Sequence, residues 1–155
     1  MEEETVPGEG PVPSERMIIG EAPGSKEVEM GRPFVGKSGI LLGTALKELG
    51  LRRDDIYVTN VVKFHPQDES SKTRPPTFKE CSWAYHNELM EEITRVRPAK
   101  SLALGKTAQR WGGVPGVGIM VKAWHPAYVL RNGGYGSDVY KLWFEQLRPF
   151  AEDTL

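Results

Sequence analysis

Short apolar runs alternate with longer amphipathic segments along this chain. The apolar runs are rich in β-branched and aliphatic residues, and their lengths are typical of buried strands. We expect four strands, at residues 17–19, 56–59, 101–104 and 119–124. No run approaches the roughly 18 apolar residues that a membrane-spanning helix needs. The amino terminus also lacks the basic flank and apolar core of a signal peptide, so we expect no membrane association.

Helices are expected between these strands. Residues 38–49 carry leucines at i, i+4 and i+7, begin with Ser38 as an N-cap and stop at Gly50. Thr77 and Glu80 form a capping box that opens a second helix, which runs to about residue 96. Two more helices are expected, at about 106–111 and 137–150. This alternation predicts an α/β fold with three layers, α/β/α, around a central four-stranded parallel sheet.

Residues 1–15 differ in composition from the rest of the chain. They contain five glutamates, three prolines and two glycines but no Lys or Arg, which is typical of a flexible segment. We expect a flexible acidic leader, either simply solvated or acting as an arm that mimics DNA, followed by a single domain over 16–155. The chain has a net charge of −1. The predicted domain alone has 20 basic and 16 acidic residues, a balance that permits a polyanionic partner without requiring one.

Residues 31–38 satisfy the phosphate-loop pattern GxxxxGK[ST]. A true phosphate loop follows a buried strand directly, whereas the charged segment 25–30 precedes this one. The second and third predicted strands are followed by Asn60 and Gly105, so neither supplies the aspartate that holds magnesium in such enzymes. A phosphate-loop NTPase therefore remains only an alternative, and we expect no nucleotide cofactor.

Four linked motifs give a more specific indication: GEAPG at 20–24, GRPFVG at 31–36, TNVVK at 59–63 and HPAYVLR at 125–131. In order and near spacing they resemble the uracil-DNA glycosylase superfamily, and most of all its fourth family. The resemblance runs from about residue 16 to 131 and on into the last helix. It implies a monofunctional enzyme that flips uracil out of DNA and hydrolyses its N-glycosidic bond. A DNA-binding module that keeps this fold without activity is the alternative.

The resemblance and the chemistry of base removal together assign three catalytic roles. His125 is expected to donate a hydrogen bond to the negative charge that develops on uracil O2. Asn60 is expected to read the O4 and N3–H edge of the base, and Glu21 to stabilise the sugar cation or to orient water. Each residue also has a purely structural explanation, since Asn60 ends a strand and His125 stands in a turn before Pro126.

Four further residues are expected to shape the pocket. The flipped base is expected to lie against Phe34, and the resemblance places Glu27 beside its C5 atom. Gly20 and Ala22 belong to the loop that surrounds the reacting bond; Ala22 stands where the best-known family has an aspartate. Phe34 as a core residue and Glu27 as a solvated loop charge are the alternatives.

The last motif also resembles, at residues 128–131, the family's loop that enters the DNA minor groove. Tyr128 or Leu130 is expected to fill the vacated base stack, with Arg131 on a phosphate. Further phosphate contacts, which weaken with salt, are expected from lysines near the strand ends: Lys37, Lys63, Lys106 and Lys122.

One departure from the family pattern concerns its iron–sulfur cluster. The fourth family usually holds this cluster on four cysteines, but here only Cys81 matches, and Phe64 follows Lys63 where a cysteine is usual. One cysteine supplies neither a disulfide nor a full set of cluster ligands. We expect no cluster, metal or other cofactor, uracil-containing DNA as the partner, a monomer, and a cytoplasmic setting in a bacterium or a virus.

Overall fold

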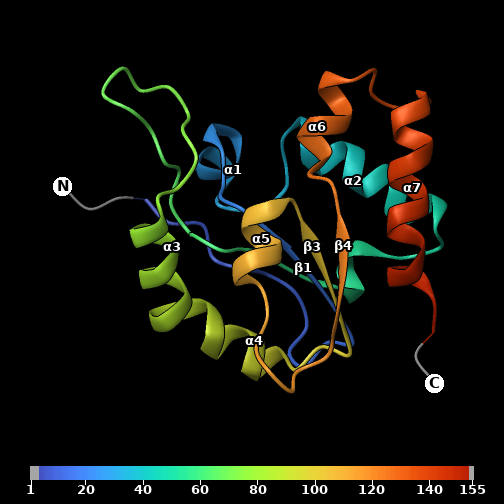
Figure 1. Cartoon of the computed structure of the whole chain (residues 1–155), viewed down its shortest axis with the longest axis horizontal. Coiled ribbons are helices and arrows are strands. Elements are labelled where there is room, and N and C mark those ends of the chain that lie inside the picture. The colour runs from blue at the N-terminus through green and yellow to red at the C-terminus, as the bar shows by residue number, and fades with distance from the viewer. Residues whose placement is uncertain (1–3, 154–155) are drawn as a thin grey trace.

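The computed structural model of this chain describes residues 4–153. Within them, four parallel strands form one sheet in the order β2-β1-β3-β4 (Figure 1). Their bounds lie close to the predicted runs: β1 Arg16–Gly20, β2 Tyr57–Asn60, β3 Lys100–Leu104 and β4 Ile119–Ala123. From β1 the chain winds first to β2 and then crosses to β3 on the other side. The strand order therefore reverses between β1 and β3, where open α/β sheets bind ligands at their carboxyl edge.

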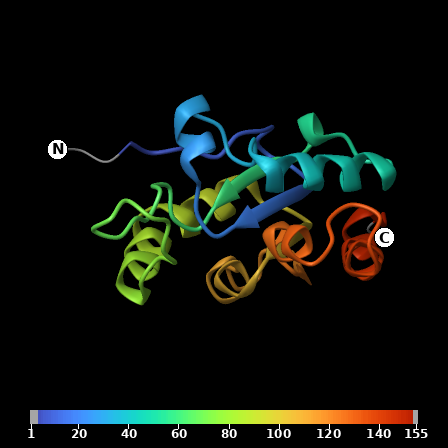
Figure 2. The same ribbon diagram turned by 90° about the horizontal axis from the view of Figure 1, so that it is seen from above.

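Helices cover both faces of the sheet (Figure 2). One face packs against α2 (Lys37–Glu48), α6 (Pro126–Arg131) and α7 (Asp138–Ala151). The other packs against α3 (Phe78–Ala84), α4 (Met90–Val96) and α5 (Lys106–Trp111). Successive strand residues point to opposite faces, so Ile18 enters the first core while Met17 and Ile19 enter the second. The predicted three-layer α/β/α fold is confirmed.

The long predicted helix between β2 and β3 begins at its capping box. Thr77 Oγ1 accepts a hydrogen bond from the Glu80 backbone N–H at 3.1 Å, and the Glu80 carboxylate accepts one from the Thr77 N–H at 2.9 Å. A π-helical turn, η2 (Tyr85–Leu89), joins α3 to α4. The helical path therefore continues to Val96, as the sequence predicts.

Two local expectations were wrong, and one short helix was not predicted. The N-cap of α2 is Gly36, so Ser38 lies inside the helix instead of capping it. Residues 128–131, expected as a loop, belong to α6. The charged segment Ser25–Met30 forms a short helix, α1, that has no buried residue. Because α1 presents no apolar face to a core, periodicity gives no signal for it.

The described part of the predicted leader, residues 4–15, packs against the sheet. Glu9 pairs with Val58 of β2 through two backbone hydrogen bonds of 2.9 and 2.8 Å. The Val6 side chain is buried, and its backbone N–H donates to the Lys63 carbonyl at 2.7 Å. β2 is the edge strand, and its unpaired backbone groups bind this segment. Residues 1–3 of the leader lie outside the described residues. No helix between residues 4 and 153 is long and apolar enough to cross a membrane.

Candidate active site

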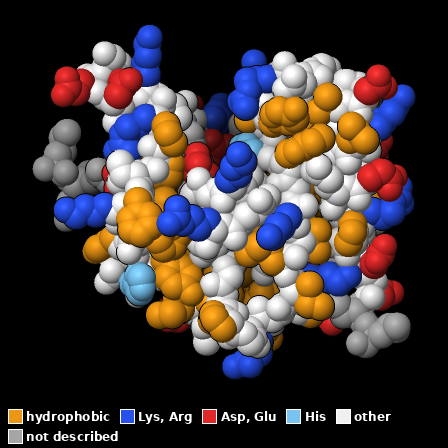
Figure 3. All heavy atoms as spheres, viewed as in Figure 1, with side chains coloured by type: hydrophobic (Ala, Val, Ile, Leu, Met, Phe, Trp, Pro, Cys, Tyr) orange, Lys and Arg blue, Asp and Glu red, His pale blue; other side chains and the backbone are white. Residues whose placement is uncertain are grey.

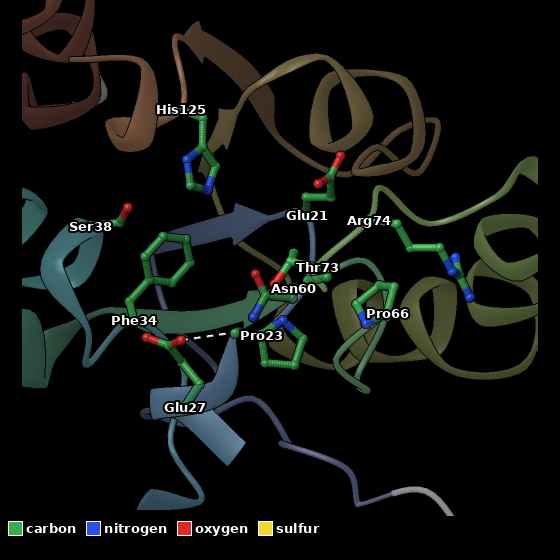
Figure 4. Close-up of a pocket in the computed structure, with 12 residues that line it drawn as sticks. Glu21, Pro23, Glu27, Phe34, Ser38, Asn60, Pro66, Thr73, Arg74 and His125 are labelled. Carbon is green, nitrogen blue, oxygen red and sulfur yellow. Dashed lines mark hydrogen bonds between the residues drawn. The ribbon is translucent and has the colours of Figure 1, made fainter. Parts of the chain in front are cut away.

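A cavity of about 220 Å³ opens at the carboxyl ends of β1 and β2. This volume is below the ~300–1,000 Å³ of sites for drug-sized ligands, so it suits a smaller molecule such as one pyrimidine ring. Figure 4 shows side chains from several separate loops converging on it. Six of the residues singled out by sequence line this cavity: Glu21, Ala22, Glu27, Phe34, Asn60 and His125.

Asn60 presents an unpaired amide to the cavity. It is the last residue of β2, directly opposite Gly20 of β1, and only 3% of its surface is exposed. Among the described residues its side chain has no hydrogen-bond partner, while its backbone carbonyl accepts one from Lys63 Nζ. A buried amide is stabilised only when its donor and acceptor are paired. Asn60 is therefore ready to pair with a ligand that offers both a donor and an acceptor.

His125 is neutral, and its surroundings select one tautomer. The residue caps α6, and its Nδ1 accepts a hydrogen bond from the Ala127 backbone N–H at 3.1 Å. Burial, with a smaller contribution from the nearby Arg131 charge, lowers the pKa of His125 to about 4. A neutral imidazole that accepts at Nδ1 carries its proton on Nε2. At neutral pH, His125 therefore offers one N–H donor at Nε2.

The ring of Phe34 forms a wall of the cavity next to this imidazole. The two ring centroids are 6.2 Å apart and the rings are inclined by 29°. Phe34 also packs in the core against α2, so it belongs both to the core and to the cavity wall. Its backbone φ of +52° is one that a bulky residue rarely adopts.

Gly20 makes room for this arrangement. A Cβ atom at Gly20 would lie 2.4 Å from Phe34 Cζ and 2.5 Å from Asn60 Oδ1. Real Cβ atoms do not approach other heavy atoms so closely, so any other residue would displace the ring or the amide. Gly20 therefore shapes the pocket by leaving the space that the Phe34 ring and the Asn60 amide occupy.

Glu27 fastens the Phe34 loop to α1. Its carboxylate accepts backbone hydrogen bonds from Gly24 at 3.0 Å, Val35 at 3.0 Å and Gly36 at 2.7 Å. Burial alone would raise the pKa of Glu27, but these donors outweigh it and hold the pKa below its usual value. Glu27 is therefore ionised and holds the loop through backbone hydrogen bonds. It is not a solvated loop charge.

Glu21 faces the cavity from the loop after β1 (Figure 4). Its Oε2 accepts a hydrogen bond of 2.6 Å from Thr107 Oγ1, in the first turn of α5. Thr107 was not singled out by sequence. It fixes the direction of the Glu21 carboxylate, and an uncharged hydroxyl does so without neutralising the charge.

Sequence reasoning also missed the loop that follows β2. Pro66, Thr73 and Arg74 line the cavity, with Pro23 from the loop after β1 and Ser38 from the first turn of α2. In Figure 4 the guanidinium of Arg74 points away from the cavity, toward Glu80, whose carboxylate accepts bonds of 2.8 and 3.0 Å from it. No motif marks this loop. Its only signal is its position directly after the TNVVK motif.

The predicted phosphate contact of Lys63 is wrong. Its residue is 8% exposed, and its Nζ forms a 2.8 Å ion pair with Glu92 and donates to Thr59 Oγ1 at 3.0 Å. Tyr57 donates to the other Glu92 oxygen at 2.6 Å. A buried ammonium is stable only when it is paired in this way, so Lys63 holds Glu92 and the Asn60 backbone carbonyl instead of presenting its charge to solvent.

Comparison with known proteins agrees with this geometry. The sequence model described as "Uracil DNA glycosylase superfamily" matches residues 7–148. The chain belongs to the uracil-DNA glycosylase superfamily. The match begins inside the predicted leader, in agreement with the packing of that segment.

Several relatives of this superfamily member are named type-4 uracil-DNA glycosylase. The protein from Pyrobaculum aerophilum is 38% identical over 149 residues, covering 82% of this chain and 74% of the relative. The protein from Thermotoga maritima is 36% identical over 143 residues, covering 82% and 72%. The one from Archaeoglobus fulgidus is 38% identical over 106 residues, covering 68% and 51%.

The residues of this superfamily member do not fit an iron–sulfur cluster. Cys81, its one cysteine, lies on α3 and is buried in the second core, against which Phe64 also packs. Burial, with the charges of Glu21 and Glu80, raises the pKa of its thiol, which disfavours the thiolate that binds iron. Between residues 4 and 153, no group of three or more His, Cys, Asp or Glu side chains is arranged to hold a metal ion.

The other expected DNA contacts lie on the surface. Tyr128 and Leu130 are exposed on α6, and Lys and Arg side chains are spread over the centre of the face in Figure 3, with acidic side chains mainly at its rim. The remaining basic candidates are all exposed: Lys37, Lys106, Lys122 and Arg131. Their contacts with DNA remain predictions.

Proposed function

We propose that this superfamily member is a monofunctional uracil-DNA glycosylase that acts in base excision repair. One observation carries the proposal: the unpaired amide of Asn60 and the Nε2–H side of a neutral His125 belong to the same cavity, beside the ring of Phe34. A flipped uracil needs all three groups. The relatives named type-4 uracil-DNA glycosylase support the same conclusion.

The base end of the reaction is handled by three residues. Phe34 stacks on the flipped ring, and the Asn60 amide donates to O4 while its oxygen accepts from N3–H. Cytosine presents the reverse pattern at these two positions, so it leaves both amide groups unpaired. As the N1–C1′ bond breaks, its electron pair passes to the base, and His125 Nε2–H stabilises the charge on O2.

The sugar end is assigned to Glu21. The carboxylate, held by Thr107, stabilises the positive charge that develops at C1′ and orients the attacking water. Water supplies the hydroxyl group that bonds to C1′, and its proton balances the departing uracil anion. Ala22 contributes no polar side-chain group, so backbone groups of the loop 20–24 complete the contacts to water.

The enzyme is proposed to hydrolyse the base without cutting the strand. Strand cleavage by a glycosylase uses an amine that attacks C1′. Of the described residues that line the cavity, none is a lysine, and Lys63 is held by Glu92. We further propose a monomer that works inside the cell on uracil-containing DNA without metal or nucleotide cofactor.

The direct test is incubation with oligonucleotides that contain one uracil, in single-stranded and duplex form. Matched oligonucleotides with thymine or cytosine at the same position are the controls. We expect alkali-sensitive abasic sites only from uracil, and no strand break before alkali. DNA binding without base release would favour an inactive DNA-binding module, and ATP hydrolysis would favour the phosphate-loop alternative.

A further inference from the structure

We propose that Glu9 and Arg53 are positioning residues that hold Phe34 in its base-stacking conformation. The segment once expected to be a flexible leader then forms part of the pocket's support. This inference rests on the proposed function, because the conformation of Phe34 matters only if a base stacks on it. Neither residue lines the cavity.

Arg53 donates hydrogen bonds to the backbone carbonyl groups on both sides of the Phe34 Cα atom. It lies in a short 3-10 turn, η1 (Arg53–Asp55), just before β2. Its Nη1 donates to the carbonyl of Phe34, and its Nη2 donates to the carbonyl of Pro33. These carbonyls belong to the peptide planes before and after Phe34. A single planar guanidinium therefore fixes both φ and ψ of this residue.

Glu9 in turn fixes the arginines. Its Oε2 lies 3.8 Å from Arg53 Nη2, and its two carboxylate oxygens accept hydrogen bonds of 2.9 and 2.7 Å from Arg32. The Glu9 backbone is anchored by its pairing with Val58. A continuous series of contacts therefore connects the edge of β2 to Glu9, and Glu9 to the two arginines next to Phe34, Arg32 and Arg53.

The Phe34 loop needs such support because its conformation is intrinsically unfavourable. A positive φ for a residue other than glycine is strained and persists only where surrounding contacts impose it. The loop is also pressed against α2: a Cβ atom at Gly39 would lie 2.0 Å from the Phe34 carbonyl oxygen. Glu27 holds the next two residues, Val35 and Gly36, from the other side. Without Arg53, the carbonyl groups of Pro33 and Phe34 would lose the guanidinium donors that hold them in place.

The decisive variants are Arg53→Lys and Glu9→Gln. A lysine ammonium is a point charge and does not present two donors in a fixed fork. Hydrogen bonds to charged groups contribute about 1.5–3 kcal/mol, so we expect Arg53→Lys to weaken inhibition by free uracil and to lower excision by roughly 10- to 100-fold. Because Glu9 acts through partly exposed ion pairs, we expect a loss of about 2- to 5-fold for Glu9→Gln.

Two matched controls separate positioning from general stability. Arg16 also donates to backbone carbonyls, those of Phe150, Ala151 and Glu152 at 2.8–3.1 Å, but these belong to the end of α7 and not to the Phe34 loop. Glu145 forms a two-hydrogen-bond ion pair with Arg148, as Glu9 does with Arg32. Arg16→Lys and Glu145→Gln are expected to leave uracil inhibition and excision unchanged. Their melting temperatures serve as the reference for the two test variants.

A double-mutant cycle with Phe34→Leu tests the mechanism directly. If Arg53 acts through the Phe34 ring, Arg53→Lys has little further effect on uracil inhibition once the ring is gone. Equal effects in both backgrounds, or wild-type uracil inhibition in both folded test variants, would overturn the proposal. If Arg53→Lys does not fold, the same cycle with Glu9→Gln decides. A wild-type protein that neither binds uracil nor excises it would instead refute the proposed function.

Discussion

Nδ1 of His125 accepts a hydrogen bond from the backbone N–H of Ala127 at 3.1 Å, so the first turn of α6 determines which ring nitrogen carries the proton. The same helix carries Tyr128 and Leu130 on its exposed side. One short helix thereby links the proposed minor-groove contact to the proposed leaving-group donor. Its formation places both groups at once.

Removing the His125 donor is predicted to slow catalysis far more than it weakens DNA binding. We expect His125→Ala to lower the excision rate by about 10²–10³-fold, the size of losing one donor to a developing anion. His125→Asn is the control for helix capping, since asparagine is a good N-cap but lacks the imidazole's reach. We expect it to restore melting temperature without restoring single-turnover excision. Undiminished excision by either variant would contradict the assignment.

Stability is predicted to depend on pH through His125. Its pKa is about 4 in the folded protein and about 6.5 when unfolded, so the unfolded chain binds more protons between these values. The free energy of unfolding should therefore fall as pH drops from 6.5 to 4, by up to about 3 kcal/mol. Denaturant unfolding of wild type and His125→Gln across this range measures the difference. Parallel profiles would show that His125 has no lowered pKa.

Lys63 and Lys106 are predicted to respond oppositely to replacement by glutamine. Lys63→Gln removes the cation from the buried Glu92 carboxylate, which keeps the Tyr57 hydroxyl as a partner; breaking a buried ion pair costs about 3–5 kcal/mol of folding free energy. It should not alter the salt dependence of DNA binding. Lys106→Gln should leave the melting temperature nearly unchanged and reduce the slope of log K against log salt for duplex DNA by about 0.9. An unchanged slope for Lys106→Gln would remove this residue from the DNA interface.

The purified protein is predicted to be colourless. A single buried cysteine does not supply the ligands of a four-iron cluster. Visible absorbance and assays of iron and labile sulfide on anaerobically purified protein provide the measurement. Stoichiometric iron and sulfide in an intact monomer would contradict the prediction.

The fold was predictable because its strands and longer helices bury apolar faces. Strand β3 and helix α5, for example, appear in the sequence almost with their observed bounds. Helix α1 was missed because it buries nothing, and the packing of Val6 was missed because glutamates, prolines and glycines dominate its segment. Composition describes the segment only on average. Its position is set by the burial of Val6 and by backbone pairing with the edge strand β2, neither of which changes the composition.

The site was predictable where residues lie at or just after the carboxyl ends of strands, as Asn60 and His125 do. The error at Lys63 has a physical cause: three residues beyond the end of β2, its side chain already points inward to Glu92. The contributions of Thr107, Arg53 and Glu9 depend on tertiary contacts between segments far apart in sequence. No local pattern contains that information.

Exchanging the amide of Asn60 for a carboxylate tests the central claim most directly. Asn60→Asp keeps the shape of the side chain but loses the donor to O4, while the carboxylate still accepts from the N4 amine of cytosine. A site built to pair a base edge rejects a base that leaves it unpaired by up to about 10⁴-fold. The measurement is excision of uracil and cytosine from matched oligonucleotides by wild type and Asn60→Asp, beside a thermal melt. We predict that uracil excision collapses and residual activity shifts toward cytosine at a near-wild-type melting temperature; a stable variant that excises uracil as fast as wild type would contradict the account.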